Sequence, residues 1–238
     1  MNDKISELKN LAEASSRIVF FGGAGVSTES GIPDFRGAAG LYRGKHRIPP
    51  ETVLSHTFFR HYPEEFYEFY RAHMVYPDAQ PNAAHRKLAE WERDGRLLAV
   101  VTQNIDGLHQ AAGSEKVLEL HGTIHKNHCM RCGAFHSLSQ VMAQEGAARC
   151  DCGGLIKPDV VLYEESLDTQ TLSDAVGAIH DADLLIVGGT SLSVYPAAGL
   201  IEYYRGKRLV LINKTETAYD DQADLIIREP IGEVFSQL

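Results

Sequence analysis

The sequence has no apolar run that approaches the roughly 20 residues that a membrane-spanning helix needs. Residues 1–16 also lack the apolar centre of a secretory signal peptide and are expected to form an amphipathic helix. Basic residues are in the minority: 23 lysines and arginines face 32 acidic residues, a formal net charge of −9. This charge argues against non-specific binding to nucleic acid and suits a cationic partner. We therefore expect a cytoplasmic protein with no membrane segment and no direct, specific nucleic-acid partner.

Cysteine is also scarce, and the four cysteines lie close together. They form two pairs, Cys129/Cys132 and Cys150/Cys152, with 17 residues between the pairs. In a reducing compartment, grouped cysteines favour a metal over disulfides. Four thiolates complete the tetrahedral shell of a zinc ion, and a shell without an open position indicates a structural metal. The sequence therefore predicts one structural zinc. A nucleic-acid-binding zinc ribbon is the rival interpretation, which the acidic composition disfavours.

No internal repeat and no low-complexity segment is present in the 238 residues. Short apolar runs alternate with amphipathic stretches, which predicts a doubly wound α/β domain. The expected strands are residues 17–21, 97–101, 117–120, 160–163, 184–187, 208–213 and 225–227. The expected helices are residues 3–15, a pair within 57–75 broken at Pro63, 83–93 and 169–180. The length allows one domain with a smaller insertion.

A glycine-rich stretch, residues 22–37, follows the first expected strand and reads GGAGVSTESGIPDFRG. A strand, a glycine turn and a helix start together let a backbone approach a pyrophosphate. Taken alone, the glycines also fit a plain structural turn. The next residues, 37–50, are rich in glycine and proline and predict a long loop. A long loop beside a nucleotide site is more often functional than accidental.

Polar residues follow three other expected strands. Residues 102–109 read TQNIDGLH, residues 121–122 are His-Gly, and residues 188–196 read GGTSLSVYP. Ligands of open parallel sheets collect at the carboxyl ends of strands, so these stretches are candidate site segments. Each stretch alone could equally be a hydrogen-bonded turn or a helix cap.

Together these stretches resemble the motifs of the sirtuins, the NAD-dependent protein-lysine deacylases. The similarity covers residues 17 to about 231, follows the family's order of motifs, and is closest in kind to compact bacterial sirtuins. It implies a Rossmann-like doubly wound parallel sheet in residues 1–123 and 156–238. It also implies a small inserted zinc-binding module in residues 124–155, with the helical part of the small domain within 37–80. The active site would lie in the cleft between the two parts.

The resemblance implies an NAD-dependent protein-lysine deacetylase. NAD would be consumed, the acetyl group would pass to ADP-ribose, and nicotinamide, O-acetyl-ADP-ribose and free lysine would be released. Acetyl-lysine proteins or peptides would be the partners, and His121 would be the catalytic base. Two alternatives stay open: a protein ADP-ribosyltransferase, and a deacylase for other short acyl groups. A non-catalytic binder could dispense with the polar residues at these strand ends, and their presence speaks against it.

Site residues follow from the positions that match the family's motifs. The implied NAD-binding residues are Ala24, Thr28, Phe35, Arg36, Gln103, Asn104, Ile105, Asp106, His121, Thr190, Ser191, Asn213 and Ile231. Within this set, the residues up to Asp106 would serve the nicotinamide ribose and pyrophosphate, and Thr190, Ser191 and Asn213 the adenosine half. The implied peptide contacts are Val160, Leu162, Tyr163, Ser193 and Val194, where the peptide would lie as an extra strand.

The acyl group also has a sequence indicator. Sirtuins that prefer succinyl or malonyl lysine resemble one another in a Tyr-x-x-Arg pair on the helix before a Pro-Asn motif. A gap-free count back from Pro81 places Phe69 and Ala72 at these positions. Neither side chain carries a charge or a hydrogen-bond donor. We therefore expect a deacetylase with weak or absent desuccinylase activity.

Overall fold

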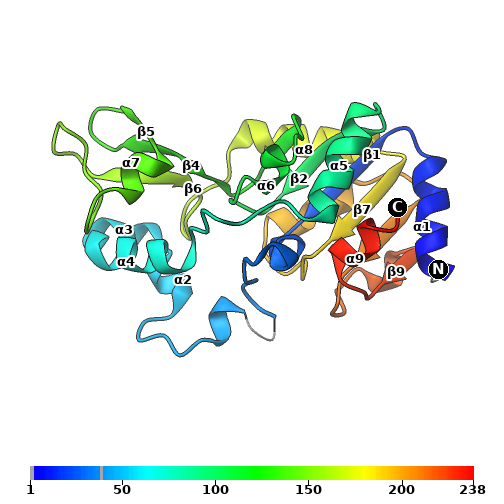
Figure 1. The fold of residues 1–238 in the computed structure, drawn as a ribbon, viewed down its shortest axis with the longest axis horizontal. Coiled ribbons are helices and arrows are strands. Elements are labelled where there is room, and N and C mark those ends of the chain that lie inside the picture. Colours follow the sequence, from blue (N-terminus) through cyan, green and yellow to red (C-terminus); the bar gives the residue numbers. More distant parts are fainter. Residues whose placement is uncertain (1–2, 38–39) are drawn as a thin grey trace.

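Six parallel strands form the main sheet of the structure, a computed structural model that describes residues 3–37 and 40–238 (Figure 1). The strand order is β3-β2-β1-β7-β8-β9. The strands are Ile18–Gly22 (β1), Leu97–Thr102 (β2), Val117–Glu119 (β3), Leu184–Gly188 (β7), Leu209–Ile212 (β8) and Leu225–Ile227 (β9). The chain builds from β1 to β3 on one side and resumes at β7 on the other, so the order reverses between β1 and β7. Open α/β sheets bind ligands at such a reversal, and the predicted Rossmann-like fold is confirmed.

Helices cover both faces of this sheet, because its strands carry apolar side chains on both sides. Ile18 and Phe20 of β1 point to one face, and Val19 and Phe21 point to the other. The first face is covered by α1 (Asp3–Glu13), α5 (Ala83–Arg93) and α9 (Ile231–Phe235), and the second by α8 (Thr169–Asp181) and the 3₁₀ helix η4 (Ala197–Tyr203). Within the described ranges, none of the helices has the length and apolar character needed to cross a membrane.

A second, smaller sheet lies at the opposite end of the molecule from the N- and C-termini (Figure 1). Its antiparallel order is β5-β4-β6, and it packs with α7 and with three helices that precede β2 in the chain. These elements are β4 (Gly122–Cys129), β5 (Phe135–Ser137), β6 (Ile156–Val160), α2 (Pro50–Val53), α3 (His56–His61), α4 (Pro63–His73) and α7 (Leu138–Met142). Phe59 and Phe66 from the helices share one core with Ile156 of β6. The helix pair broken at Pro63 is confirmed.

The strand predicted at residues 160–163 is wrong, because the strand is β6 and ends at Val160. Pro158 lies within β6, which pairs with β4 alone in the described sheet and is thus an edge strand, a place where a sheet tolerates proline. Beyond Val160 the chain turns away. The N–H of Leu162 donates to the Glu165 carboxylate, and the N–H of Tyr163 donates to a carbonyl outside the sheet.

The α-helix start predicted after the first glycines is also wrong. The chain instead forms two short 3₁₀ turns, Ala24–Val26 and Thr28–Ser30. The side-chain amide of Asn82 explains the second turn, since it donates to Val26 O at 2.7 Å and to Ser30 Oγ at 3.0 Å. Residues 38–39 of the predicted loop and residues 1–2 of the predicted large domain lie outside the described residues.

Candidate active site

The turns that follow β1 and β7 touch each other at the reversal of strand order. The N–H of Gly25 donates to Gly189 O at 2.8 Å. A Cβ at Gly25 would lie 2.8 Å from Gly189 Cα, and a Cβ at Gly189 would lie 2.3 Å from Val26 N. Neither position therefore accepts a side chain, and the two turns present bare backbone. Ala24 and Thr28 belong to the same region, where the Thr28 hydroxyl donates to Gly25 O at 2.9 Å.

Three polar side chains from the first and second strand ends form one buried chain of hydrogen bonds. The amide of Asn104 donates to Ser27 Oγ at 3.1 Å, and the Ser27 hydroxyl donates to Asp106 Oδ2 at 2.6 Å. The other carboxylate oxygen of Asp106 accepts the N–H of Leu108, which begins the short helix α6 (Leu108–Ala111), at 2.9 Å. Ser27 is fully buried and was missed by sequence reasoning. The only signal for it was a hydroxyl inside the glycine turn.

His121 follows β3 and is oriented by the end of β2. Its Nδ1 lies 3.0 Å from Gln103 O. A carbonyl oxygen only accepts, so Nδ1 carries the proton and Nε2 keeps its lone pair. Gln103 is itself fixed, since its N–H donates to Gly22 O at 2.9 Å and its side chain donates to Thr190 Oγ1 at 3.2 Å. Burial lowers the pKa of His121, against the opposing effect of this hydrogen bond, so the imidazole is neutral at pH 7 and can accept a proton.

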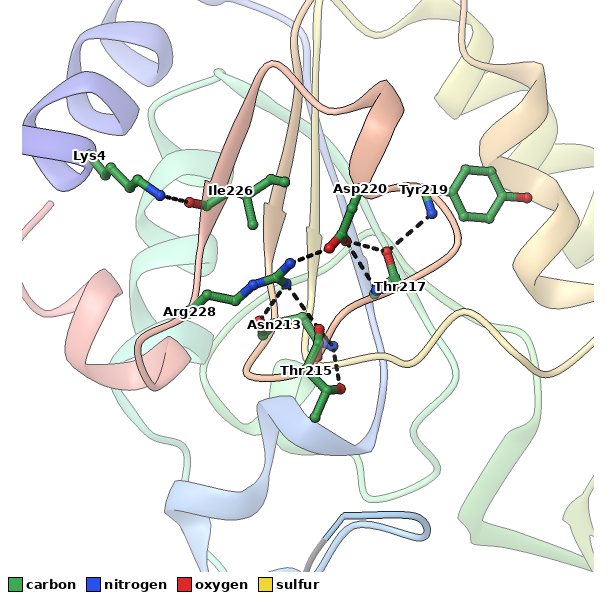
Figure 2. Close-up of polar contacts among 8 residues, drawn as sticks. All are labelled: Lys4, Asn213, Thr215, Thr217, Tyr219, Asp220, Ile226 and Arg228. Atoms are coloured by element: carbon green, nitrogen blue, oxygen red, sulfur yellow. Dashed lines mark hydrogen bonds and ion pairs between the residues drawn. The ribbon is translucent and has the colours of Figure 1, made fainter.

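Asn213 follows β8 and lies in a loop whose backbone is bonded by the half-buried Arg228 (Figure 2). The Arg228 guanidinium donates to Asn213 O and Thr215 O, both at 3.0 Å, and pairs with Asp220. The side-chain amide of Asn213 donates to Thr215 O at 2.9 Å. The loop backbone is therefore held from three directions. Arg228 was not predicted as a site residue, because nothing in its sequence neighbourhood distinguishes it from a surface charge.

The remaining predicted NAD contacts differ in their exposure. Phe35 and Ile105 pack against the core of the small domain, at the junction of the two parts. Arg36 is exposed, with its guanidinium carbon 5.1 Å from the centroid of the Tyr42 ring. Ile231 is buried in the core of the main sheet, 4% exposed, at the start of α9. Its side chain is thus occupied by packing, and its backbone is the part left to meet a ligand.

The predicted peptide contacts fall on two segments. They are Val160, Leu162 and Tyr163 at and after the end of β6, and Ser193 and Val194 after the β7 turn. The N–H of Val161 donates to His121 O at 2.9 Å, which ties the first segment to the candidate base. The backbone of Tyr163 is already paired, with its N–H on Leu54 O and its carbonyl on the N–H of His56, each at 3.0 Å. The hydroxyls of Ser191 and Ser193 lie 2.7 Å apart in the second segment.

The four cysteines converge in the small domain. All four sulfurs lie within 4.8 Å of one another, and no disulfide joins them. Three of the S···S distances are 3.5, 3.7 and 3.5 Å. A tetrahedral zinc with Zn–S bonds of about 2.3 Å separates its sulfurs by about 3.8 Å, so the donor set fits this ion. The backbone N–H of Cys132 lowers the pKa of Cys129 to about 6, which favours the thiolate that a metal requires.

Two buried histidines lie behind the Ser27–Asp106 chain, and sequence reasoning missed both. His85 of α5 is 0% exposed and His109 of α6 is 1% exposed, with ring centroids 4.7 Å apart. Among the described residues, His85 Nε2 and both ring nitrogens of His109 have no hydrogen-bond partner. Burial lowers the pKa of His85 to about 4, and burial and the neighbouring His85 lower that of His109 well below its ordinary value.

This histidine pair predicts a loss of stability in mild acid. The unfolded chain takes up protons below the ordinary histidine pKa of 6.5, and the folded chain does not until the pH approaches 4. The contribution of this pair to the free energy of unfolding should therefore be fully present above about pH 6.5 and be lost between pH 6.5 and 4. His85 alone contributes on the order of 3 kcal/mol to this loss. Urea unfolding at a series of pH values measures it.

Two variants separate this effect from general acid unfolding. His109→Phe cannot be protonated and should flatten part of the pH dependence. His180→Ala removes an exposed histidine of α8 and should keep the whole of it. A His109→Phe protein with the same pH slope as the parent would contradict the assignment.

The known sequences that are similar to this chain are Sir2 proteins and NAD-dependent protein deacetylases. The profile of the Sir2 family matches residues 23–196. An NAD-dependent protein deacetylase of Clostridium acetobutylicum is 60% identical over 236 residues, which cover 98% of this chain and 96% of that protein. An NAD-dependent protein deacetylase of Staphylococcus aureus is 44% identical over 241 residues, which cover 100% of this chain and 99% of that protein.

Solved structures agree with the sequence matches. A Sir2 variant with deacetylated p53 peptide and 3′-O-acetyl-ADP-ribose superposes with a TM-score of 0.91 at 40% identity, covering 98% of this chain and 96% of that chain. Sir2 with p53 peptide and NAD⁺ gives a TM-score of 0.86 at 40% identity, with the same coverage of 98% and 96%. Sir2 bound to acetylated peptide gives 0.86 at 38% identity, again covering 98% and 96%.

Proposed function

The chain belongs to the Sir2 family, and from that premise we infer that it is an NAD-dependent protein-lysine deacetylase. The relatives that span its whole length carry this activity in their names, and the related solved structures hold acetylated peptide, NAD⁺ and acetyl-ADP-ribose. The observation that carries the inference in this structure is His121. It is neutral, has its proton fixed on Nδ1 by Gln103 O, and follows β3 at the same edge of the parallel sheet as the glycine turns after β1 and β7.

The residue roles follow from the contacts, and we propose them in two groups. NAD would supply a ribose carbon to which the acetyl oxygen of the substrate bonds as the bond to nicotinamide breaks. His121 Nε2 would take the proton of a neighbouring ribose hydroxyl, so that this hydroxyl oxygen can attack the acetyl carbon. Water would then release the lysine nitrogen from that carbon and leave the acetyl group on the ribose oxygen. Asp106 would contact the nicotinamide end of NAD. Its carboxylate is held in place by the Ser27 hydroxyl and the Leu108 N–H, and Asn104 donates to Ser27 in turn. The products would be nicotinamide, O-acetyl-ADP-ribose and free lysine.

The phosphates and the adenosine half would occupy the other strand ends. The bare backbone at Gly25 and Gly189 allows a pyrophosphate to come close, and exposed Arg36 supplies a donor fork for its oxygens. Thr190 and Ser191 would contact the adenosine side. Asn213, whose amide hydrogens are engaged by Thr215, would use its side-chain oxygen to accept a ribose hydroxyl.

We also propose the division of the chain and its setting. Residues 1–123 and 156–238 would form the NAD-binding domain, and residues 124–155 would form the zinc module, with the helical part of the small domain in 37–80. The acidic composition favours protein over nucleic-acid partners. The location would be the cytoplasm.

Mass spectrometry of an acetyl-lysine peptide, incubated with the protein with and without NAD, tests the function. We expect the acetyl mass to be lost only with NAD, together with one nicotinamide released per lysine freed. Nicotinamide release with the ADP-ribose mass added to a protein, and no loss of acetyl, would identify the ADP-ribosyltransferase alternative. An unchanged peptide, with no release of nicotinamide and no ADP-ribose mass added to any protein, would refute both.

The acyl preference gives a prediction that the structure sharpens. Arg71, the cation nearest to the two diagnostic positions in sequence, donates to the carbonyls of Gln144 and Gly146 and so serves the loop after α7. Phe69 packs against His73, whose pKa is lowered by burial and by its histidine neighbour, so it offers no charge at pH 7. A carboxylate buried without a partner costs several kcal/mol, equivalent to about a thousandfold in rate. We expect kcat/KM for succinyl-lysine to fall below that for acetyl-lysine by about this factor.

Matched acetyl and succinyl peptides measure this preference. The double change Phe69→Tyr with Ala72→Arg should raise succinyl activity relative to acetyl. The single change Phe69→Tyr, which adds a donor without a charge, should raise it less. A succinyl value equal to or above the acetyl value in the parent protein would overturn the prediction.

A further inference from the structure

Tyr42 contacts residues predicted to bind NAD and also a residue predicted to bind the peptide. It lies in the 3₁₀ turn Leu41–Arg43, six residues after Arg36. Its ring packs edge-on against Phe35, with centroids 5.5 Å apart, and the Arg36 guanidinium carbon lies 5.1 Å from its ring centroid. Its N–H donates to Phe35 O at 2.9 Å. The two residues predicted to meet the nicotinamide ribose and the pyrophosphate are thus both supported by this one side chain.

The hydroxyl of Tyr42 reaches to the peptide side of the site. It lies 2.5 Å from the hydroxyl of Tyr163, which follows β6. The backbone of Tyr163 is held from both sides, because it is paired with the corner between α2 and α3 through Leu54 and His56, while the residue is 38% exposed. Burial raises the pKa of Tyr42, so its hydroxyl stays protonated and can donate to the hydroxyl of Tyr163.

We propose that the Tyr42–Tyr163 hydroxyl pair positions Phe35 and Arg36 for NAD by anchoring their loop on the peptide-binding segment. This inference rests on the proposed function. Tyr163 is then a positioning residue for the cofactor, although it belongs to the segment predicted to hold the acyl-lysine peptide. The bond joins two chain segments that are 121 residues apart, and the ring contacts of Tyr42 carry its effect to Arg36.

The test uses the zinc-loaded protein without peptide, titrated with NAD and separately with AMP. Tyr42→Phe and Tyr163→Phe remove the same hydrogen bond from its two ends and keep both rings. Each should raise the Kd for NAD about two- to tenfold, the effect of one hydrogen bond. The double variant should bind NAD no more weakly than either single variant, because the bond can be lost only once. The Kd for AMP should be unchanged, since AMP reaches only the adenosine side.

Tyr203→Phe, which changes an exposed tyrosine of η4, is the matched control and should keep the parent's Kd for NAD. A bond that merely stabilises the fold would lower the melting temperature of the variants and leave the Kd for NAD as it is, which would overturn the proposal. Additive losses in the double variant, or equal losses for NAD and AMP, would also overturn it. A parent protein that binds AMP and NAD at no measurable level would instead refute the proposed function, and this inference with it.

Discussion

Replacing Cys132 by alanine is expected to abolish deacetylation and unfold the small domain, although no cysteine takes part in the chemistry. The binding energy of a structural metal is also folding energy. Two of the sulfurs lie at the β4–β5 turn and two in the turn before β6, so a metal bound by all four would link the two turns. Without the metal, this link between the two turns of the small sheet is lost. Since β4 begins directly after His121, this disorder reaches the candidate base.

Metal analysis and thermal melting measure this effect together. The parent protein should contain about one zinc per chain, and Cys132→Ala should contain less and melt at a lower temperature. Met130→Ala changes an exposed residue between Cys129 and Cys132, and it should keep both zinc and activity. A fully active protein that contains no metal would contradict the prediction.

His121→Ala is expected to lose about 10²- to 10⁴-fold in turnover, the usual contribution of a general base. The fold and NAD binding should persist, because the Nδ1 contact is made to Gln103, whose backbone β1 also holds through the bond from Gln103 N–H to Gly22 O. His121→Asn is the sharper variant, since its amide can still donate to Gln103 O but cannot accept a proton at neutral pH. Equal losses for both variants would assign the effect to the proton acceptor.

The pH profile of the parent protein checks the same role. Because burial lowers the pKa of His121, the acid limb of kcat/KM should have its midpoint below the ordinary histidine value of 6.5. Near-parental turnover of His121→Asn, or an acid limb above that value, would show that another group is the base.

The main sheet could be predicted from sequence because its strands are buried on both faces. Leu184–Val187 is a continuous apolar run, and only a strand of that length fits between the flanking turns. The small sheet could not be predicted, because β4 carries polar residues such as Lys126 and Asn127 at positions where an isolated strand shows apolar alternation. Its stability comes from the cysteine cluster and from α2–α4, which are distant in the chain.

In the candidate site, the residues of the motifs could be predicted from the sequence. The residues that hold them in place could not. His121 and Asp106 could be named because they follow strands and match the family's motifs. Ser27, Arg228 and the His85/His109 pair could not, because their roles depend on partners 79, 15 and 24 residues away or on burial that no local pattern reports. Glu164 has a left-handed backbone, φ 75°, and its carboxylate accepts the N–H of Thr57 at 2.8 Å, a contact that no local pattern indicates.

Only Leu120 and His121 separate the last residue of β3 from the first residue of β4. At this crossing the chain passes directly from the main sheet to the small sheet. The next residue, Gly122, has φ 71°, and a Cβ there would lie 1.8 Å from Asp159 O. This position therefore accepts no side chain. At this crossing, a rotation of one sheet against the other would therefore also change the orientation of His121. The geometry of the candidate base would depend on how the two sheets are arranged.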